Sequence, residues 1–125
     1  MNLIIGGAYQ GKTEYAMARF SLKPEDIFTC QGDTPADFSK KCLRRLEEYA
    51  RYALHQGREP LELLLEQEEL WQDSVFVCDE ISCGIVPMDA EERAWRESVG
   101  RMLCALTARA ETVTRLFCGL PQVLK

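Results

Sequence analysis

Residues 6–13, GGAYQGKT, combine residue types that bind phosphate groups in proteins. Glycines allow a tight backbone path whose N–H groups point at phosphate oxygens, and a helix that begins at Lys12 directs its positive dipole end at the same anion. Lys12 adds a cation for the β and γ phosphates, and the Thr13 hydroxyl can bind Mg²⁺. The spacing therefore predicts a phosphate-binding loop for ATP or GTP with Mg²⁺. The loop residues are Gly6, Gly7, Ala8, Tyr9, Gln10, Gly11, Lys12 and Thr13.

The alternative is a glycine-rich turn in which the lysine occurs by chance, because such a turn could have the same sequence. The surroundings of the motif favour the phosphate loop, because the apolar run Leu3-Ile4-Ile5 precedes it and a helical pattern follows it. A strand before the glycines and a helix after them are the context that this motif requires.

A second group of candidate residues follows the apolar run at residues 75–78. Asp79 comes directly after this run, where phosphate-loop proteins place a Mg²⁺-binding aspartate. We expect Asp79 to hold Mg²⁺ directly or through water, together with Thr13, and Glu80 to orient a nucleophile or bind a second substrate. The alternative is that both acidic residues only end a strand at the solvent-exposed edge of a sheet. Lys12, Asp79 and Glu80 are thus the candidate catalytic residues.

Alternating strand and helix patterns must position these groups. Strands are predicted at 2–6, 26–30, 74–79 and 112–118, with a short edge piece after Gly119. Helices are predicted at 12–20, from about 34 to 56, from Pro60, and from Asp89, which can cap the last helix. The helix from Thr34 rests on an apolar stripe at helical spacing: Phe38, Cys42, Leu46, Tyr49, Ala50 and Ala53.

The alternation predicts an α/β fold, a P-loop NTPase-like three-layer sandwich with a small, mostly parallel sheet of about four strands. We expect residues 1–125 to form a single nucleotide-binding domain. The expected strand order is 26–30, 74–79, 2–6, 112–118. This order places Asp79 and Lys12 side by side at the carboxyl edge of the sheet, where open α/β sheets bind ligands.

The charge of the chain argues against a nucleic-acid partner. The net charge is −5, and binding to a phosphate backbone needs a basic surface. The one basic cluster, KKCLRR at residues 40–45, is followed directly by Glu47 and Glu48. Alternating charge blocks favour a solvated helix face for this cluster.

The cysteines do not have a metal-binding spacing. They are Cys30, Cys42, Cys78, Cys83, Cys104 and Cys118, and none forms a Cys-x-x-Cys pair. We expect reduced, mostly buried thiols in a cytoplasmic protein, with a zinc site as the less favoured alternative. No apolar stretch is long enough to span a membrane, and the first apolar run ends in glycines, so neither a membrane partner nor a signal peptide is expected.

Further motifs lie in residues 4–13 and 75–125. The first stretch reads Gly-Gly-Ala-x-x-Gly-Lys-Thr after its apolar run. The second contains Glu80, Gly84-Ile85-Val86-Pro87, Arg93-Ala94-Trp95-Arg96, Gly100-Arg101 and Gly119-Leu120-Pro121. These motifs, in this order, resemble the bifunctional adenosylcobinamide kinase/adenosylcobinamide-phosphate guanylyltransferase family. The resemblance covers the two ends of the chain, and the Gly-Ile-Val-Pro segment is its most specific part.

The resemblance implies phosphoryl transfer from ATP or GTP in cobalamin biosynthesis, with a corrinoid as second substrate. Arg93 or Arg96 then becomes a candidate to contact the acceptor or the transferred phosphate, with surface salt bridges as the alternative. Two features depart from the family. Leu103-Cys104 stands where the family has Asn-Gln. The family also has an additional middle strand with an acidic end, followed by helices. We expect this chain to be too short to contain them.

The family's guanylyltransferase reaction uses a histidine in a helix reading Glu-x-x-x-Arg-x-x-x-His, and Glu47, Arg51 and His55 keep this spacing. The resemblance therefore makes His55 a candidate nucleophile. A charged helix gives the same spacing, and the helix dipole favours a histidine near a helix C-terminus. We expect this plainer explanation, because the predicted helix from Thr34 would carry His55 roughly 30 Å from its start, to the opposite edge of the sheet.

The favoured interpretation is a P-loop nucleotide-binding protein with kinase-type phosphoryl transfer, with guanylyl transfer less favoured. The alternative is a non-catalytic relative that binds nucleotide as a regulatory or partner-binding subunit, which the short middle and Leu103-Cys104 support. A plain small-molecule kinase or hydrolase would share the loop without explaining residues 84–87. The sequence leaves the choice between ATP and GTP open, and it is compatible with a homo-oligomer.

Overall fold

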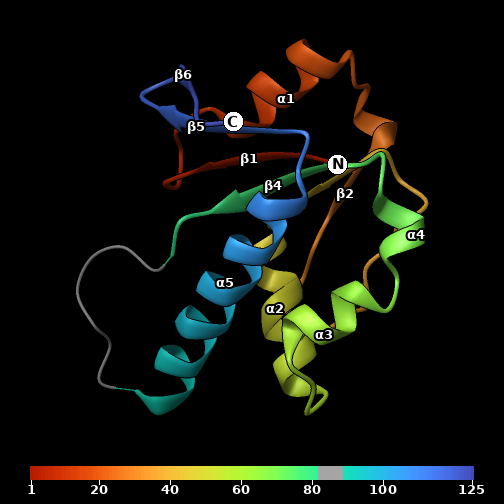
Figure 1. Cartoon of the computed structure of the whole chain (residues 1–125), viewed down its shortest axis with the longest axis vertical. Coiled ribbons are helices and arrows are strands. Elements are labelled where there is room, and N and C mark those ends of the chain that lie inside the picture. Colours follow the sequence, from red (N-terminus) through yellow and green to blue (C-terminus); the bar gives the residue numbers. More distant parts are fainter. Residues whose placement is uncertain (82–88) are drawn as a thin grey trace.

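The computed structural model describes residues 1–81 and 89–125, which form a six-stranded sheet with helices on both faces (Figure 1). The strands are β1 (Asn2–Gly6), β2 (Ile27–Thr29), β3 (Cys42–Arg44), β4 (Val75–Asp79), β5 (Thr112–Phe117) and β6 (Leu120–Val123). The helices are α1 (Lys12–Phe20), α2 (Leu46–His55), α3 (Pro60–Leu65), α4 (Glu68–Trp71) and α5 (Ala90–Arg109), with a 3-10 turn at Pro24–Asp26. Cys83 and the Gly84–Pro87 motif lie outside the described residues.

The strand order is β2-β3-β4-β1-β5-β6, and only β6 runs antiparallel to its neighbour. In the register of the central strands, Gly6 lies opposite Asp79 of β4 on one side and Leu116 of β5 on the other. The predicted α/β class and the adjacency of strands 2–6 and 74–79 are confirmed. The predicted number of strands is wrong, because the sheet has six strands where about four were expected.

Two apolar layers cover the sheet, which makes the molecule a three-layer sandwich. Helix α1 covers one face, and α2, α3 and α5 cover the other (Figure 1). The residues of β4 alternate between the layers: Val75 and Val77 pack on the side of α1, and Phe76 and Cys78 pack on the opposite side. A parallel strand with both faces buried requires this continuous apolar run, which is why the sequence signal for β4 was clear.

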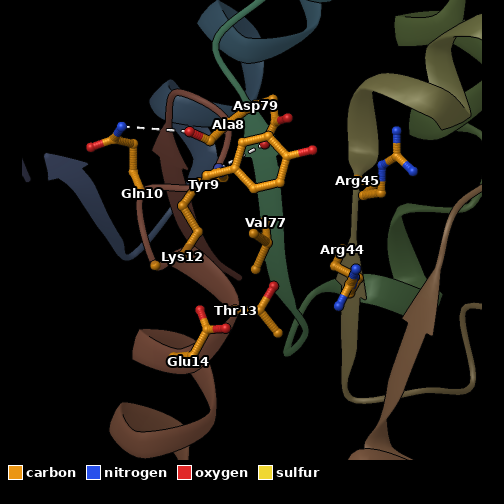
Figure 2. A pocket seen from close by; sticks show the side chains of 11 residues that line it. Ala8, Tyr9, Gln10, Lys12, Thr13, Glu14, Arg44, Arg45, Val77 and Asp79 are labelled. Carbon is orange, nitrogen blue, oxygen red and sulfur yellow. Dashed lines mark hydrogen bonds and ion pairs between the residues drawn. The ribbon is translucent and has the colours of Figure 1, made fainter. Parts of the chain in front are cut away.

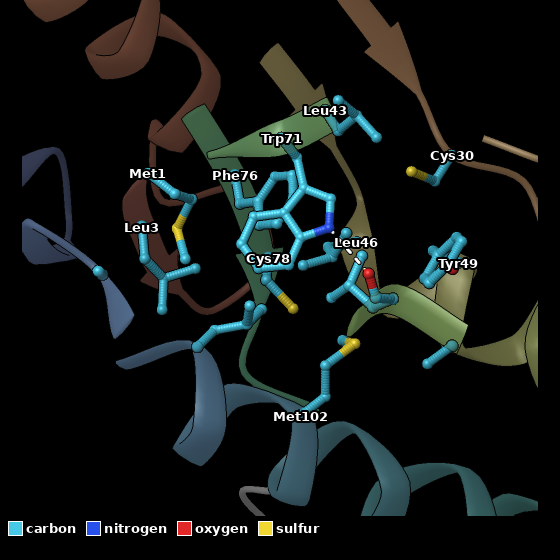
Figure 3. Close-up of a cluster of buried hydrophobic side chains, with 14 of the residues drawn as sticks. Met1, Leu3, Cys30, Leu43, Leu46, Tyr49, Trp71, Phe76, Cys78 and Met102 are labelled. Atoms are coloured by element: carbon cyan, nitrogen blue, oxygen red, sulfur yellow. Dashed lines mark hydrogen bonds between the residues drawn. The ribbon is translucent and has the colours of Figure 1, made fainter. Parts of the chain in front are cut away.

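The larger core lies between the sheet and helices α2, α3 and α5. Figure 3 shows the Trp71 and Phe76 rings side by side above Met102 of α5. The two ring centroids are 5.3 Å apart, and the Trp71 indole N–H donates to the carbonyl of Leu64 at 2.9 Å. The buried indole therefore has a hydrogen-bond partner, as burial of a polar group demands.

The predicted helix from about 34 to 56 is wrong in its first half. Residues before Cys42 form turns, residues 42–44 form β3 between β2 and β4, and the helix begins only at Leu46. Cys42 and Leu43 are both fully buried and pack into opposite apolar layers, as neighbours on a strand do. The expectation that the chain lacks an additional middle strand is also wrong, because β3 is an additional strand in the middle of the chain. The end of β3 is basic, not acidic.

Two further predictions, the cap of the last helix and the edge piece after Gly119, are confirmed. Asp89 caps α5 by accepting a hydrogen bond from the Glu91 N–H at 2.8 Å, and the tail after Gly119 forms the edge strand β6. Within the two described ranges, no helix has the length and apolar content needed to cross a bilayer.

Candidate functional site

The loop at residues 6–13 depends on glycine at two positions. A Cβ atom on Gly6 would lie 2.6 Å from the carbonyl oxygen of Leu116 in the neighbouring strand, so only glycine fits there. Gly11 has φ of 86°, in the left-handed region, and is the N-cap of α1. These two positions turn the chain from the end of β1 into the start of α1.

The β5–β6 hairpin braces the outside of the loop. The Gly119 N–H donates to the Gln10 carbonyl at 3.1 Å, and the Cys118 N–H donates to the Gln10 side-chain oxygen. Tyr9, at the tip of the loop, is fully exposed. Sequence reasoning missed this brace, because the contact joins segments that are more than a hundred residues apart in sequence.

Lys12 and Asp79 form an ion pair at the carboxyl edge of the sheet. Lys12 Nζ lies 2.7 Å from Asp79 Oδ1 and also donates to the Gly7 carbonyl at 2.6 Å. The Lys12 side chain is 7% exposed and that of Asp79 is 27% exposed. The expectation that these residues lie side by side is confirmed, and it follows from the pairing of β1 with β4.

A cavity of about 440 Å³ opens beside this ion pair. Its walls are residues 8–14 of the loop and first turn of α1, Val77 and Asp79 of β4, and Arg44 and Arg45 at the end of β3 (Figure 2). The interpretation of residues 40–45 as a solvated helix face is therefore wrong for the two arginines. Arg44 ends the buried strand β3 and Arg45 follows as the N-cap of α2, at the sheet edge that the carboxyl ends of the parallel strands share.

The residues of this cavity fit a nucleoside triphosphate with Mg²⁺. Gly11 has no side chain to cap α1, and no side-chain cap is found among the described residues, so the first N–H groups of α1 are available to an anion. The Thr13 hydroxyl and the Asp79 carboxylate supply the oxygen ligands that Mg²⁺ prefers. The described residues hold no group of three or more acidic, histidine or cysteine side chains suited to a metal ion. A Mg²⁺ ion held by these two side chains would take its other ligands from phosphate oxygens and water, as Mg²⁺ bound with phosphates commonly does.

Glu47 is a buried carboxylate behind the cavity wall that sequence reasoning did not assign to this site. It is 2% exposed, and its Oε1 accepts a hydrogen bond from the Asp79 N–H at 3.0 Å. Burial raises the pKa of the Glu47 carboxyl, although the hydrogen bond from Asp79 opposes this rise. The backbone of Asp79 is thus fixed by a side chain from the first turn of α2.

Glu80 lies outside the cavity walls. Its N–H donates to the Gly6 carbonyl at 2.9 Å, and its Oε2 accepts from Arg115 Nε at 3.3 Å. In this structure Glu80 ties β4 to β1 and β5 at the edge of the sheet. The contact of Glu80 with a nucleophile or second substrate stays a prediction.

The Glu47-Arg51-His55 spacing belongs to α2, and each member has a separate partner. The Arg51 guanidinium lies 3.8 Å from the centre of the Trp95 ring and pairs with Glu92 at 3.2 Å. His55 Nδ1 lies 2.8 Å from the Gly32 carbonyl at the far end of the helix. Neither Arg51 nor His55 lines the cavity.

Helix α5 carries Arg93 and Arg96, the other cations considered for the acceptor side. Both lie in the first half of the helix, and neither lines the cavity beside the loop. The cavity cations are instead Lys12, Arg44 and Arg45.

Comparisons with known proteins identify the family. A search of curated proteins finds no match. A family model described as cobinamide kinase / cobinamide phosphate guanyltransferase matches residues 40–124, from the residues just before β3 to the end of the β5–β6 hairpin. Because this match covers more than half of the chain, the protein belongs to the cobinamide kinase / cobinamide phosphate guanyltransferase family.

Proposed function

We propose that the chain binds ATP or GTP with Mg²⁺ on residues 6–13 and transfers the terminal phosphoryl group, the kinase half of the family's chemistry. One observation carries this proposal. The Lys12–Asp79 ion pair, at 2.7 Å, lies on the wall of the cavity that the loop lines. A cation for phosphate and a carboxylate for a metal ion are thus present at one point.

Each residue has a role that follows from its position. The first N–H groups of α1 hold the phosphates, and Lys12 contacts the β and γ phosphates after exchanging Asp79 for them. Thr13 and Asp79 hold Mg²⁺, which when bound neutralises charge on the phosphate oxygens. Phosphoryl transfer needs mainly positioning and charge stabilisation, and these residues supply both. The family description names cobinamide, and we carry it over as the proposed acceptor.

Nucleotide binding is tested by thermal unfolding of the protein with millimolar ATP or GTP, with and without Mg²⁺. A ligand at one hundred times its dissociation constant stabilises a protein by about 2.7 kcal/mol, so a clear rise in Tm is expected. Lys12→Ala should remove most of this rise. The matched control is Lys41→Ala, because Lys41 is exposed and lies at the amino end of β3, away from the cavity.

Turnover is tested by following cobinamide-dependent formation of nucleoside diphosphate. Diphosphate release that needs both Mg²⁺ and cobinamide, and that Lys12→Ala abolishes, supports the kinase. A rise in Tm without any transfer would favour the non-catalytic, nucleotide-binding relative. The absence of a rise in Tm with either nucleotide would reject both.

A further inference from the structure

Asp79, the proposed metal ligand, lies on a part of β4 that has a neighbouring strand on one side only. The last pair between β3 and β4 is Leu43–Phe76, whereas β1 stays paired with β4 as far as Gly6–Asp79. The Glu80 N–H donates to the Gly6 carbonyl on the β1 side at 2.9 Å, and the N–H groups of consecutive strand residues point to opposite sides. The Asp79 N–H therefore faces the side on which β3 has already ended.

Glu47 supplies the acceptor that a longer β3 would have provided. A backbone N–H inside a protein needs a hydrogen-bond partner, and at Asp79 this partner is Oε1 of Glu47 at 3.0 Å. Glu47 comes from the first turn of α2 and is buried. The end of β4 is thus held from both sides, by β1 through its strand pairing and by α2 through one carboxylate.

The same carboxylate also holds a cation of the cavity wall. Arg45 lines the cavity, and its Nε lies 3.6 Å from Glu47 Oε2. Figure 2 shows Asp79 at the end of β4 and Arg45 at the start of α2, on neighbouring elements of the cavity wall. The Glu47 carbonyl accepts from the Trp95 indole N–H at 2.7 Å, which fixes Glu47 against α5. One buried residue therefore connects the proposed metal ligand, an arginine of the cavity and the long helix behind them.

A carboxylate is not the side chain that core stability favours at this position. Burial of a charge costs free energy unless the charge is paired, and apolar residues in place of a buried ion pair are often neutral or stabilising. The Arg45 side chain is 53% exposed, so its attraction for Glu47 is screened by solvent. The positive end of the α2 dipole offsets only part of the cost. Buried ionisable groups beside a cavity are typical of functional sites, which favours a role for Glu47 in the cavity.

We propose that Glu47 is a positioning residue, whose two carboxylate oxygens hold Asp79 and Arg45 in place so that Asp79 can bind the Mg²⁺ of the nucleotide complex. The inference rests on the proposed nucleotide site. Glu47 lies behind the cavity wall and acts through Asp79 rather than on the ligand. The phosphate loop is held by other contacts, those of Gly6 and of the β5–β6 hairpin, so it should bind phosphates without Glu47.

The test compares nucleotide affinity with and without the metal ion. ATP or GTP, whichever binds, is titrated by calorimetry into each protein, once with Mg²⁺ and once with EDTA, and the wild type should bind more tightly with Mg²⁺. Glu47→Leu fills similar space with apolar atoms and offers no acceptor. Its affinity should fall about tenfold with Mg²⁺ and by less than about threefold with EDTA. A merely structural role would lower both affinities alike.

Two further substitutions separate the acceptor from the charge. Glu47→Gln keeps an oxygen for the Asp79 N–H and should retain most of the Mg²⁺ effect. Glu47→Asp keeps the charge but is one methylene shorter, so it should lose this effect, and it replaces Glu47→Leu if that variant does not fold. The matched control is Glu48→Gln, the next residue of α2, whose ion pairs are with Arg45 and Arg51. It should leave the Mg²⁺ effect unchanged.

A double-mutant cycle shows whether Glu47 acts through Asp79. Asp79→Asn should remove most of the Mg²⁺ effect, and adding Glu47→Leu or Glu47→Asp to it should lower the effect no further. An additional loss in the double variant would overturn the inference, because Glu47 would then act by another route.

The remaining outcomes are equally decisive. The inference is wrong if folded Glu47→Leu or Glu47→Asp protein keeps the wild-type Mg²⁺ effect, if Glu47→Gln loses as much of it as Glu47→Leu does, or if the losses with Mg²⁺ and EDTA are equal. A wild type that binds nucleotide without any Mg²⁺ effect would reject the metal role of Asp79 and this inference, while the nucleotide site would stand. A wild type that binds neither ATP nor GTP would reject the proposed function itself.

Discussion

Lys12 Nζ, from the first residue of α1, and Asp79 Oδ1, from the last residue of β4, lie 2.7 Å apart at the carboxyl edge of the sheet. The lysine that would contact the nucleotide phosphates is therefore neutralised by the carboxylate that would hold the metal ion. Binding of a nucleotide with Mg²⁺ has to replace this one ion pair by two new interactions. The stability of the protein and its affinity for nucleotide are thus coupled through the same two side chains.

Asp79→Asn should lower the stability of the nucleotide-free protein. Lys12 is 7% exposed and loses its counter-ion, which costs about 2–3 kcal/mol, less than the roughly 3–5 kcal/mol of a fully buried pair because Asp79 is 27% exposed. In EDTA, nucleotide should raise the Tm of this variant more than that of the wild type, because phosphate replaces the missing carboxylate. Thermal unfolding of both proteins measures the difference, with exposed Asp73→Asn as control. Equal shifts in the two proteins would show that Lys12 does not contact the phosphates.

Gly6→Ala should destabilise the fold strongly, and Gly100→Ala should not. A methyl group on Gly6 meets the Leu116 carbonyl oxygen at 2.6 Å, and both groups are backbone-fixed in adjacent strands, so we expect a loss on the order of 3 kcal/mol. Gly100 lies inside α5, where a methyl group would meet no described atom within 4 Å outside its own helix turn, and alanine there should stabilise by about 0.5–1 kcal/mol. Urea unfolding of the two variants gives both values. A Gly6→Ala protein as stable as the wild type would contradict the close contact between β1 and β5.

The sequence was sufficient for the loop and its two central strands because local patterns encode them. Phosphate binding requires the spacing of Gly6, Gly11, Lys12 and Thr13, so the loop can be recognised from the sequence. The apolar run before Asp79 indicates a strand that is buried on both faces. β3 was missed for the opposite reason. It has three residues and no β-branched side chain, and the apolar positions around it also fit a helix. Because β3 was missed, the position of Arg44 and Arg45 at the cavity was missed too. The left-handed conformation of Arg45 also has no signature in the residue type.

Stability should fall at alkaline pH because of buried thiols. Burial raises the pKa of Cys30 and that of Cys42 from 9.0 to about 12. Between pH 9 and 12 the folded protein keeps these protons while the unfolded chain releases them, so each thiol lowers the free energy of unfolding by about 1.4 kcal/mol per pH unit. The stabilising effect is complete below pH 9 and is lost as the pH rises.

Urea unfolding at a series of pH values from 8 to 10.5 checks this sign. Cys42→Ala should lower stability at every pH and flatten the alkaline slope, because one of the linked protons is gone. Cys104→Ala should leave the slope unchanged, since Cys104 is exposed. Identical slopes for wild type and Cys42→Ala would mean that this thiol titrates alike in the folded and unfolded chains.

His55 should not become covalently linked to a nucleotide. Helix α2 has ten residues, so His55 lies on the order of 13 Å along the helix from Leu46, whose neighbour Arg45 lines the cavity. Attack on an α-phosphate requires contact at about 3 Å, and the 2.8 Å contact of His55 Nδ1 with the Gly32 carbonyl holds the imidazole at the end of α2 that is remote from the cavity. The sequence suggested the same reason, a helix that carries His55 away from the loop, but the helix begins at Leu46 rather than near Thr34 and is therefore shorter than expected.

The measurement is incubation with GTP labelled at the α-phosphate, followed by denaturation and a test for acid-labile label on the protein. We expect none in the wild type, and we expect His55→Ala to bind nucleotide as the wild type does. Label that the wild type retains and His55→Ala loses would show that α2 rearranges to bring the imidazole to the cavity. In that case the guanylyltransferase half of the family's chemistry would be present in this chain.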